Sequence, residues 1–459
     1  MHLHILGISG TFMSALAMLA KDLGHEVTGS DAACYPPISD LLYEKGISWT
    51  EGYENTIDAL RSDCVIVGNA IKRGMPVMED VLNAGKKYIS GPQWLAENIL
   101  GKYKVIAISG THGKTTTTSM ISYILEFAGL NPGFLIGGVA SNFRTSSRLG
   151  IGEWFVIEAD EYDTAFFDKR PKFIHYHPKV AILNNLEFDH ADIYPDLASI
   201  KLQFHYLLRT IPSKGLVIKP KSSVALNDVL KMGSYCNTEE VSLTSNANWQ
   251  AKLKIPSASS FEVYHCNQLV AQVNWNLIGD FNVENALAAI AASFYAGVSP
   301  EISARALEEF IPVKRRLEVK ASAHDITVYD DFAHHPTAIS KTIQALKKSK
   351  RHQRIIAVIE FSSYTMRTGV HVNELKHALD GIDEAYLLNP QDFAHNLFTS
   401  EWKFPYSVLN STDEIVSQVT SRVLPNDAVL VMSNRGFDNI HKKLAESIDR
   451  RFSLGAVQQ

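Results

Sequence analysis

Cysteine is scarce in this sequence, and long apolar runs are absent. The few cysteines are scattered with no close pairing, which argues against a disulfide framework and a cysteine-ligated metal and suits a reducing compartment. No uncharged apolar stretch approaches the ~20 residues that a membrane-spanning helix needs. The first residues lead into Gly7 without a basic leader or a long apolar segment, so we expect a cytoplasmic protein with no membrane partner. The cysteines are Cys34, Cys64, Cys236 and Cys266.

An excess of positive charge is also missing. The 44 lysines and arginines are outnumbered by 49 acidic residues, for a formal net charge of -5, so we expect no nucleic-acid partner. The basic run at residues 347–351 closes a helix-like segment and is interpreted as a solvated helix end. A hydrophobic share of 46% with 20% charged residues is typical of globular proteins, and 459 residues predict two to four domains.

Strand-like apolar runs alternate with helical patterns in three successive segments. Breaks near residues 90–92 and 312 separate the segments. This alternation predicts parallel sheets with ligand-binding loops at their carboxyl edges. We therefore predict an α/β fold with a Rossmann-like N-terminal domain at 1–100, a central P-loop ATPase-like domain at 101–312 and a C-terminal Rossmann-like domain at 313–459. The expected strands lie at 3–6, 26–28, 64–67, 105–108, 155–157, 180–183, 326–329, 355–359 and 428–432.

A glycine turn at the start of the first segment suggests a dinucleotide site, because the acidic Asp31 follows about 20 positions later. The fingerprint fails, however. Counting from Gly7, the second and third glycine positions hold Ser9 and Phe12. The remaining strand–turn–helix can still offer a helix N-terminus to phosphate, which favours a nucleotide-sugar diphosphate over NAD and argues against an oxidoreductase.

A phosphate-binding loop opens the second segment. Residues 110–118 read Gly-Thr-His-Gly-Lys-Thr-Thr-Thr-Thr, directly between a predicted strand and a helical pattern. In such a loop the backbone N–H groups face phosphate oxygens, Lys114 adds a positive charge, and the Thr115 hydroxyl reaches the metal. The usual loop has four residues between its glycines, whereas two separate Gly110 from Gly113 here.

Two further polar loops follow predicted strands of the same segment. Residues 158–163 place four carboxylates directly after a strand, which is costly unless a cation such as Mg²⁺ lies among them. After the next strand, residues 184–190 end in Asp189 and His190, a second candidate metal ligand with a carboxylate to orient it. For the first loop taken alone, the alternative interpretation is a solvated acidic loop. For the second, it is a histidine with a structural role.

The order and spacing of these loops resemble the Mur ligase family, and the resemblance covers essentially the whole chain. It implies an ATP-dependent ligase that uses Mg²⁺, with a UDP-sugar-binding first domain, an ATP-binding central domain and a C-terminal ligase domain. Additional matching motifs lie at 282–288, 315–318 and 330–336. Lysine carbamylation occurs in some members, and whether Lys201 is modified stays open.

Particular residues receive roles from this resemblance. ATP is expected to contact Gly110, Thr111, His112, Gly113, Lys114, Thr115, Thr116, Asn282, Asn285, Arg316 and Asp331. Mg²⁺ is expected at Thr115, Glu158 and His190, and the catalytic set is Lys114, Glu158 and His190. The UDP-sugar is expected at Gly7, Ser9, Gly10, Thr11, Phe12 and Asp31.

Within the family, two activities compete. The stretches at 7–13, 91–95, 161–170 and 184–190 resemble members that join UDP-N-acetylmuramic acid to L-alanyl-γ-D-glutamyl-meso-diaminopimelate, the murein tripeptide, in peptidoglycan recycling. The alternative is the member that adds L-alanine during de novo synthesis. A kinase or a non-enzymatic nucleotide-binding module would use the same phosphate loop, and these are the rival interpretations from other classes.

Overall fold

The apolar run at the start of the chain forms β1, the central strand of the N-terminal domain. A computed structural model describes residues 1–361, 366, 371–389 and 402–456. The first sheet has the order β3-β2-β1-β4-β5, and all its paired strands are parallel. Its elements are β1 (His2–Leu6), α1 (Thr11–Asp22), β2 (Glu26–Asp31), α2 (Ile38–Glu44), β3 (Ser48–Glu51), α3 (Ile57–Arg61), β4 (Cys64–Val67), α4 (Pro76–Asn83), β5 (Tyr88–Ser90) and α5 (Gly91–Asn98).

The central domain has a parallel core with antiparallel margins. Its sheet order is β17-β16-β15-β14-β13-β12-β6-β9-β7-β8, with antiparallel pairing among β15, β16 and β17 and between β7 and β8. The elements are β6 (Lys104–Ser109), α6 (Lys114–Phe127), β7 (Gly133–Ala140), β8 (Thr145–Arg148), β9 (Trp154–Glu158), β10 (Asp163–Ala165), β11 (Asp168–Pro171), β12 (Val180–Leu183), α7 (Leu197–Thr210), β13 (Leu216–Pro220), α8 (Val224–Lys231), β14 (Asn237–Ser242), β15 (Trp249–Leu253), β16 (Ser260–His265), β17 (Gln268–Asn274), α9 (Asp280–Tyr295) and α10 (Pro300–Glu308).

The C-terminal domain is a third α/β unit. Among the described residues its sheet runs β18-β19-β23-β20-β21-β22, and only the β18–β19 pair is antiparallel. The elements are β18 (Glu318–Ala323), β19 (Ile326–Asp331), α11 (Pro336–Ser349), β20 (Arg354–Glu360), α13 (Val372–Ala378), β21 (Glu384–Leu388), β22 (Tyr406–Leu409), α14 (Thr412–Arg422), β23 (Asp427–Met432) and α15 (Ile440–Ala456). The predicted three-domain α/β architecture is confirmed.

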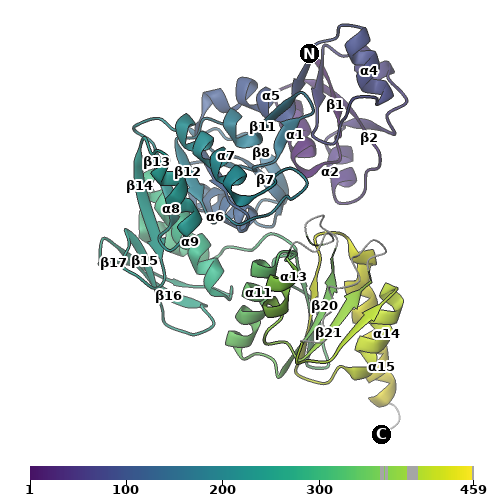
Figure 1. The fold of residues 1–459 in the computed structure, drawn as a ribbon, viewed down its shortest axis with the longest axis vertical. Coiled ribbons are helices and arrows are strands. Elements are labelled where there is room, and N and C mark those ends of the chain that lie inside the picture. Colours follow the sequence, from purple (N-terminus) through teal and green to yellow (C-terminus); the bar gives the residue numbers. More distant parts are fainter. Residues whose placement is uncertain (362–365, 367–370, 390–401, 457–459) are drawn as a thin grey trace.

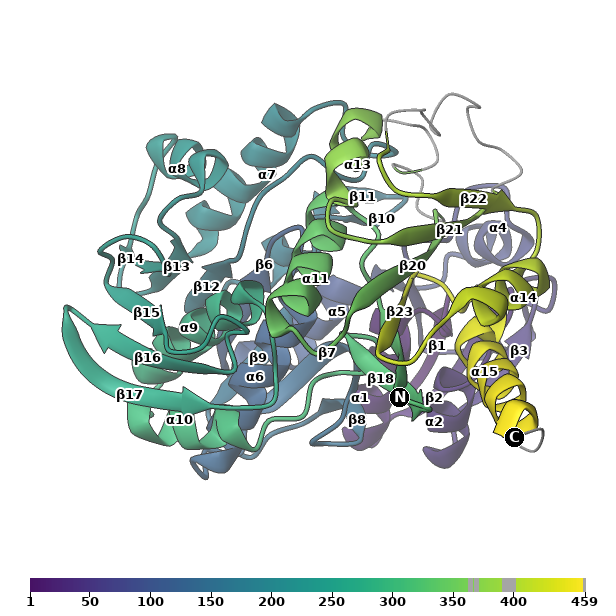
Figure 2. The same ribbon diagram turned by 90° about the horizontal axis from the view of Figure 1, so that it is seen from below.

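The three domains meet around the carboxyl edge of the central sheet (Figures 1 and 2). Helix α1 packs against β7 and β8, and one continuous apolar cluster joins the first two domains through residues such as Leu16 and Leu135. On the other side, Lys348 Nζ lies 2.6 Å from Asp280 Oδ2 and so ties α11 to the start of α9. None of the helices within the described ranges is long and apolar enough to cross a membrane.

Strand order explains why three separate loops come together. Strand β6 lies between β9 and β12 and pairs in parallel with both. The carboxyl ends of parallel neighbours meet at one edge of a sheet, so the loops that follow these strands are adjacent. These loops are the ones that the sequence singled out at residues 110–116, 158–163 and 184–190.

Candidate active site

The loop between β6 and α6 requires glycine at two positions. Gly110 has φ +136° and Gly113 has φ +82°, both in the region that L-residues with a side chain rarely adopt. A Cβ on Gly110 would lie 2.9 Å from the carbonyl oxygen of Asn185, and a Cβ on Gly113 would lie 2.6 Å from Oδ1 of Asn285. The loop is therefore pressed against its neighbours, and its N–H groups can face an anion at the start of α6.

Lys114 opens α6 in the middle of an acidic group. Its Nζ donates to the carbonyl of Gly110 at 2.6 Å and lies 3.4 Å from Asp160 Oδ1 and 3.6 Å from Glu161 Oε2. Burial alone would lower the pKa of this ammonium group, but the charges of Glu161, Asp160 and Glu158 raise it above its usual value. Lys114 is therefore a permanent positive charge aimed at the phosphate loop.

Glu158 ends β9 beside this loop. One carboxylate oxygen accepts a hydrogen bond from the backbone N–H of Gly137. Burial, followed by the negative charge of Asp160, raises the pKa of Glu158 above its usual value, although Gly137 and Lys114 act in the opposite direction. A half-buried carboxylate whose charged form is disfavoured in this way is suited to a cation partner.

His190 approaches from the loop after β12. Its Nε2 lies 3.1 Å from Oε1 of Glu161, and its ring centroid lies 4.1 Å from that of Tyr162. Burial alone would lower the pKa of His190, but the hydrogen bond to Glu161 and the charges of Glu161 and Asp189 raise it. Glu161 thus links the histidine to Lys114, since it contacts both side chains.

The C-terminal domain contributes two charged groups to the same place. Arg316 Nη2 donates to Thr115 Oγ1 at 3.4 Å, across the domain boundary. Asp331 ends β19 and accepts backbone hydrogen bonds from Leu317 at 2.7 Å and Ala333 at 2.8 Å. Burial raises the pKa of Asp331, although the charge of Arg316 opposes the rise. The two domains are therefore in contact at the phosphate loop.

A cleft of about 850 Å³ collects most of the residues that the sequence singled out. Of the residues predicted to bind the UDP-sugar, only Thr11 lines this cleft. The other five, Gly7, Ser9, Gly10, Phe12 and Asp31, do not. Of the other predicted residues, Gly110 alone does not line it and instead supports the loop beneath Lys114. The lining members are Thr111, His112, Gly113, Lys114, Thr115, Thr116, Glu158, His190, Asn282, Asn285, Arg316 and Asp331.

The first-domain loop is organised around Asp31 instead. Asp31 Oδ2 accepts from the Ser9 backbone N–H at 2.8 Å and from the Ser9 hydroxyl at 2.5 Å. Tyr53 donates its hydroxyl to Oδ1 of Asp31 at 3.2 Å, and burial together with the Asp31 charge raises the pKa of Tyr53 to about 12. Asp31, the acidic residue that sequence analysis singled out, therefore holds the turn after β1 in place through contacts within the first domain.

Sequence analysis missed several residues that shape the cleft. Asp160 and Glu161 flank Lys114, and Asn184 and Asn185 support the phosphate loop from the neighbouring strand. Asn185 Oδ1 accepts the backbone N–H of His112 at 2.7 Å. The acidic and amide runs that contain these residues were visible signals, but the sequence alone does not say which members point inward.

Lys201, the residue considered for carbamylation, lies on α7. Its Nζ forms an ion pair with Asp228 Oδ2 at 2.9 Å, and neither residue is among the described residues that line the cleft.

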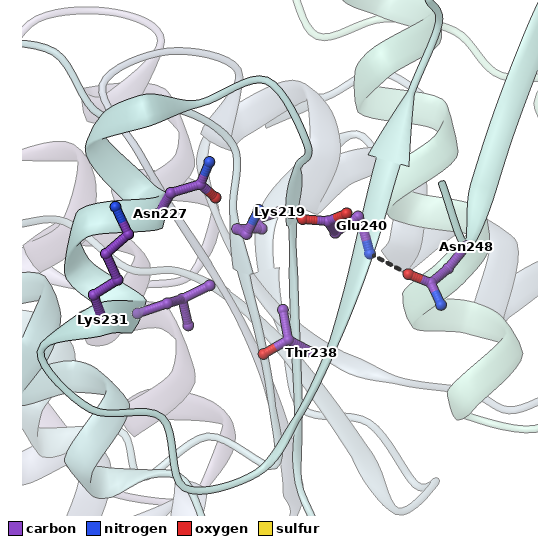
Figure 3. A pocket seen from close by; sticks show the side chains of 7 residues that line it. Lys219, Asn227, Lys231, Thr238, Glu240 and Asn248 are labelled. Carbon is purple, nitrogen blue, oxygen red and sulfur yellow. Dashed lines mark hydrogen bonds and ion pairs between the residues drawn. The ribbon is translucent and has the colours of Figure 1, made fainter. Parts of the chain in front are cut away.

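A second, more open pocket of about 580 Å³ lies near α8 and β14 (Figure 3). There the buried Lys219 is neutralised by Glu240 at 2.8 Å, and the pocket contains none of the residues predicted to act in catalysis.

Comparison with known proteins places this geometry in context. Residues 2–103 match the model "Mur ligase family, catalytic domain", residues 108–293 match "Mur ligase middle domain", and residues 315–435 match "Mur ligase, glutamate ligase domain". The UDP-N-acetylmuramate–L-alanyl-γ-D-glutamyl-meso-2,6-diaminoheptandioate ligase of Haemophilus influenzae is 47% identical, with 97% of this chain and 99% of that protein covered.

Two other proteins bear on the activity. The crystal structure of a murein peptide ligase from Psychrobacter arcticus superposes with a TM-score of 0.76 at 43% identity, over 98% of each chain. The UDP-N-acetylmuramate–L-alanine ligase of Acetivibrio thermocellus is more distant, at 32% identity over 99% of this chain and 93% of that protein.

Proposed function

The chain belongs to the Mur ligase family and is an ATP-dependent ligase, and from this premise we propose its substrates. It joins UDP-N-acetylmuramic acid to L-alanyl-γ-D-glutamyl-meso-diaminopimelate, the murein tripeptide, in peptidoglycan recycling. The observation that carries this proposal is the convergence of the loops after β6, β9 and β12 with Arg316 and Asp331 around one cleft. The relative that is named for this reaction supports the choice of substrates. The reaction takes place in the cytoplasm.

A carboxylate must be activated before an amine can attack it. In the proposed reaction the lactoyl carboxylate of the sugar attacks the γ-phosphate of ATP, which gives an acyl phosphate and ADP. The tripeptide amine then attacks the acyl carbon, and inorganic phosphate leaves. Two anions approach each other in the first step, so the positive charges of Lys114 and Arg316 lower its barrier. The contact between Arg316 and Thr115 also helps to exclude water, which would otherwise hydrolyse the acyl phosphate.

The donors near Lys114 fit Mg²⁺. Thr115 supplies a hydroxyl oxygen, and Glu158 supplies a carboxylate whose pKa is raised by burial and by Asp160. Glu161 Oε2 is buried and accepts no hydrogen bond from the described residues. Hard cations prefer such oxygen ligands and share them with nucleotide phosphates. We assign Thr115, Glu158 and His190 to the metal, which when bound neutralises charge on the transferred phosphoryl group.

Substrate choice tests the proposed function. ADP release is measured with ATP, Mg²⁺ and UDP-N-acetylmuramic acid, with L-alanine or the murein tripeptide added in turn. We expect the tripeptide alone to stimulate release, together with formation of the amide product by mass spectrometry. Stimulation by L-alanine alone would identify the biosynthetic activity. A phosphorylated sugar that accumulates without an amine would indicate a kinase, and nucleotide binding without any turnover would indicate a binding module.

The turn held by Asp31 gives a prediction for the first domain. We expect Asp31→Ala to raise KM for UDP-N-acetylmuramic acid about tenfold, because losing the charge-assisted bonds to Ser9, worth about 1.5–3 kcal/mol each, loosens the turn. The turnover number at saturating sugar should stay near the parent value, since Asp31 does not line the cleft. Steady-state kinetics with varied sugar measure both constants. An unchanged KM would contradict a sugar-binding role for this turn.

A further inference from the structure

Two histidines and a glutamate meet where the central domain touches the C-terminal domain. His112 lies in the phosphate loop and Glu187 lies in the loop after β12. His335 is the residue directly before α11. His112 Nε2 lies 3.2 Å from His335 Nδ1, and Glu187 Oε2 lies 3.5 Å from the former and 3.4 Å from the latter. The proposed ligase reaction uses the backbone of the phosphate loop and gives these three side chains no role.

The three separations have the dimensions of a metal site. Zn²⁺ binds imidazole nitrogen and carboxylate oxygen at about 2.0–2.2 Å in a tetrahedral arrangement, which places its ligand atoms roughly 3.3–3.5 Å apart. The three distances, 3.2, 3.4 and 3.5 Å, are close to the three edges of one tetrahedral face, with the fourth corner left for a solvent or substrate oxygen. Within the described part of the chain, this is the one group of three or more histidine, cysteine or acidic side chains whose ligand atoms all lie within 4.8 Å of one another.

Burial shows that these groups are not ordinary surface side chains. His335 is 5% exposed, and Glu187 Oε2 is buried without a hydrogen bond from any described residue. A buried carboxylate oxygen that lacks a donor is costly, and a bound cation would satisfy it.

The ligand chemistry selects the kind of ion. Two imidazole nitrogens and one carboxylate oxygen suit Zn²⁺ and its neighbours Co²⁺ and Ni²⁺, whereas Mg²⁺ prefers oxygen ligands. Imidazole supplies two of the three ligands here, but only His190 among the three residues assigned to Mg²⁺, so the two sites differ in chemistry. It also draws its ligands from both domains, since His335 comes from a different domain than His112 and Glu187.

We propose that His112, Glu187 and His335 form a binding site for a zinc-class divalent cation that fastens the C-terminal domain to the phosphate loop. The bound ion takes the place of the hydrogen bond between the two imidazoles and of the one that His335 Nδ1 accepts from the Thr337 backbone N–H at 3.3 Å. The proton between the rings moves to the other nitrogen of its own ring, so both ligand nitrogens are free of protons. Because all three ligands meet only when the domains are in contact, the ion favours that arrangement over any in which they separate. The site does not depend on which amine the enzyme uses.

Direct binding tests the site without reference to activity. The full-length protein, free of nucleotide and Mg²⁺, is titrated with Zn²⁺ in competition with a chromophoric chelator. We expect one tight site, and we expect His335→Asn and Glu187→Gln each to weaken it at least ~10-fold, because the loss of even an outer partner of a metal ligand costs about 10–100-fold in affinity. His377→Asn is the matched control, since His377 is a highly exposed histidine of the same domain. Binding that is absent, that survives both ligand variants, or that His377→Asn abolishes would overturn the proposal.

A second measurement tests the bridge between domains. Lys314 is exposed and lies in the connection between the two domains, so trypsin cleavage after it reports on their separation. We expect Zn²⁺ to slow this cleavage severalfold in the parent and in His377→Asn, but not in His335→Asn. If Zn²⁺ binds tightly and cleavage is unchanged, the ion does not fasten the domains and that part of the proposal is wrong. Melting curves of the metal-free variants establish that each is folded.

Discussion

Lys114→Ala is expected to lower the turnover number at least ~10²-fold, which corresponds to about 2.7 kcal/mol of transition-state stabilisation. Lys114 Nζ is fixed by the carbonyl of Gly110 and flanked by Asp160 and Glu161, and its pKa is raised, so the charge is present throughout the pH range of the assay. Removing it leaves the approach of two anions uncompensated. Steady-state ADP release at saturating ATP measures the loss.

The control for this variant is a lysine on the strand that leads into the phosphate loop. Lys104 begins β6, at the end opposite the phosphate loop, and forms an exposed ion pair with Glu153 at 2.7 Å. Exposed pairs contribute little, so Lys104→Ala should keep turnover within about twofold of the parent. Thermal unfolding of both variants separates a catalytic loss from a folding defect. Near-parent turnover in a folded Lys114→Ala protein would remove Lys114 from the reaction.

Much of the central cleft could be predicted from the sequence because its elements are local. Each loop follows a strand that its apolar run identifies, and β9, β6 and β12 turn out to be neighbours in the sheet. The glycines of the phosphate loop could also be anticipated, since a close backbone approach excludes a Cβ there. The position of Glu158 at a strand end is a further consequence of this local pattern.

Contacts between distant segments could not be predicted in the same way. The separation of His112 and His335 by 223 residues means that neither periodicity nor spacing links them. The antiparallel strands β15, β16 and β17 were also missed, because their runs mix apolar and polar residues and do not stand out as buried strands. Asp31 was identified by its position, but its bonds to Ser9 depend on how β2 lies beside β1.

Glu158→Gln is expected to raise the Mg²⁺ concentration needed for half-maximal turnover at least ~10-fold, because the loss of even an outer partner of a metal ligand costs about 10–100-fold in affinity. The amide keeps the size of the side chain but removes the negative charge, and a neutral oxygen binds a hard cation less strongly. Glu158 is half-buried at the end of β9 and lines the same cleft as Thr115, which is the reason that we assign it to the metal. Turnover is measured against Mg²⁺ at fixed saturating ATP.

The matched variant is Glu153→Gln, which changes a glutamate just before the other end of β9. Glu153 is exposed and pairs with Lys104, so its replacement should leave the Mg²⁺ titration unchanged. The contrast isolates the effect of position from that of removing one carboxylate. If Glu158→Gln and Glu153→Gln gave superimposable titrations, Glu158 would not contact the metal. A loss of maximal turnover without a shift of the titration would instead give Glu158 a role in holding β7 at the edge of the cleft through Gly137.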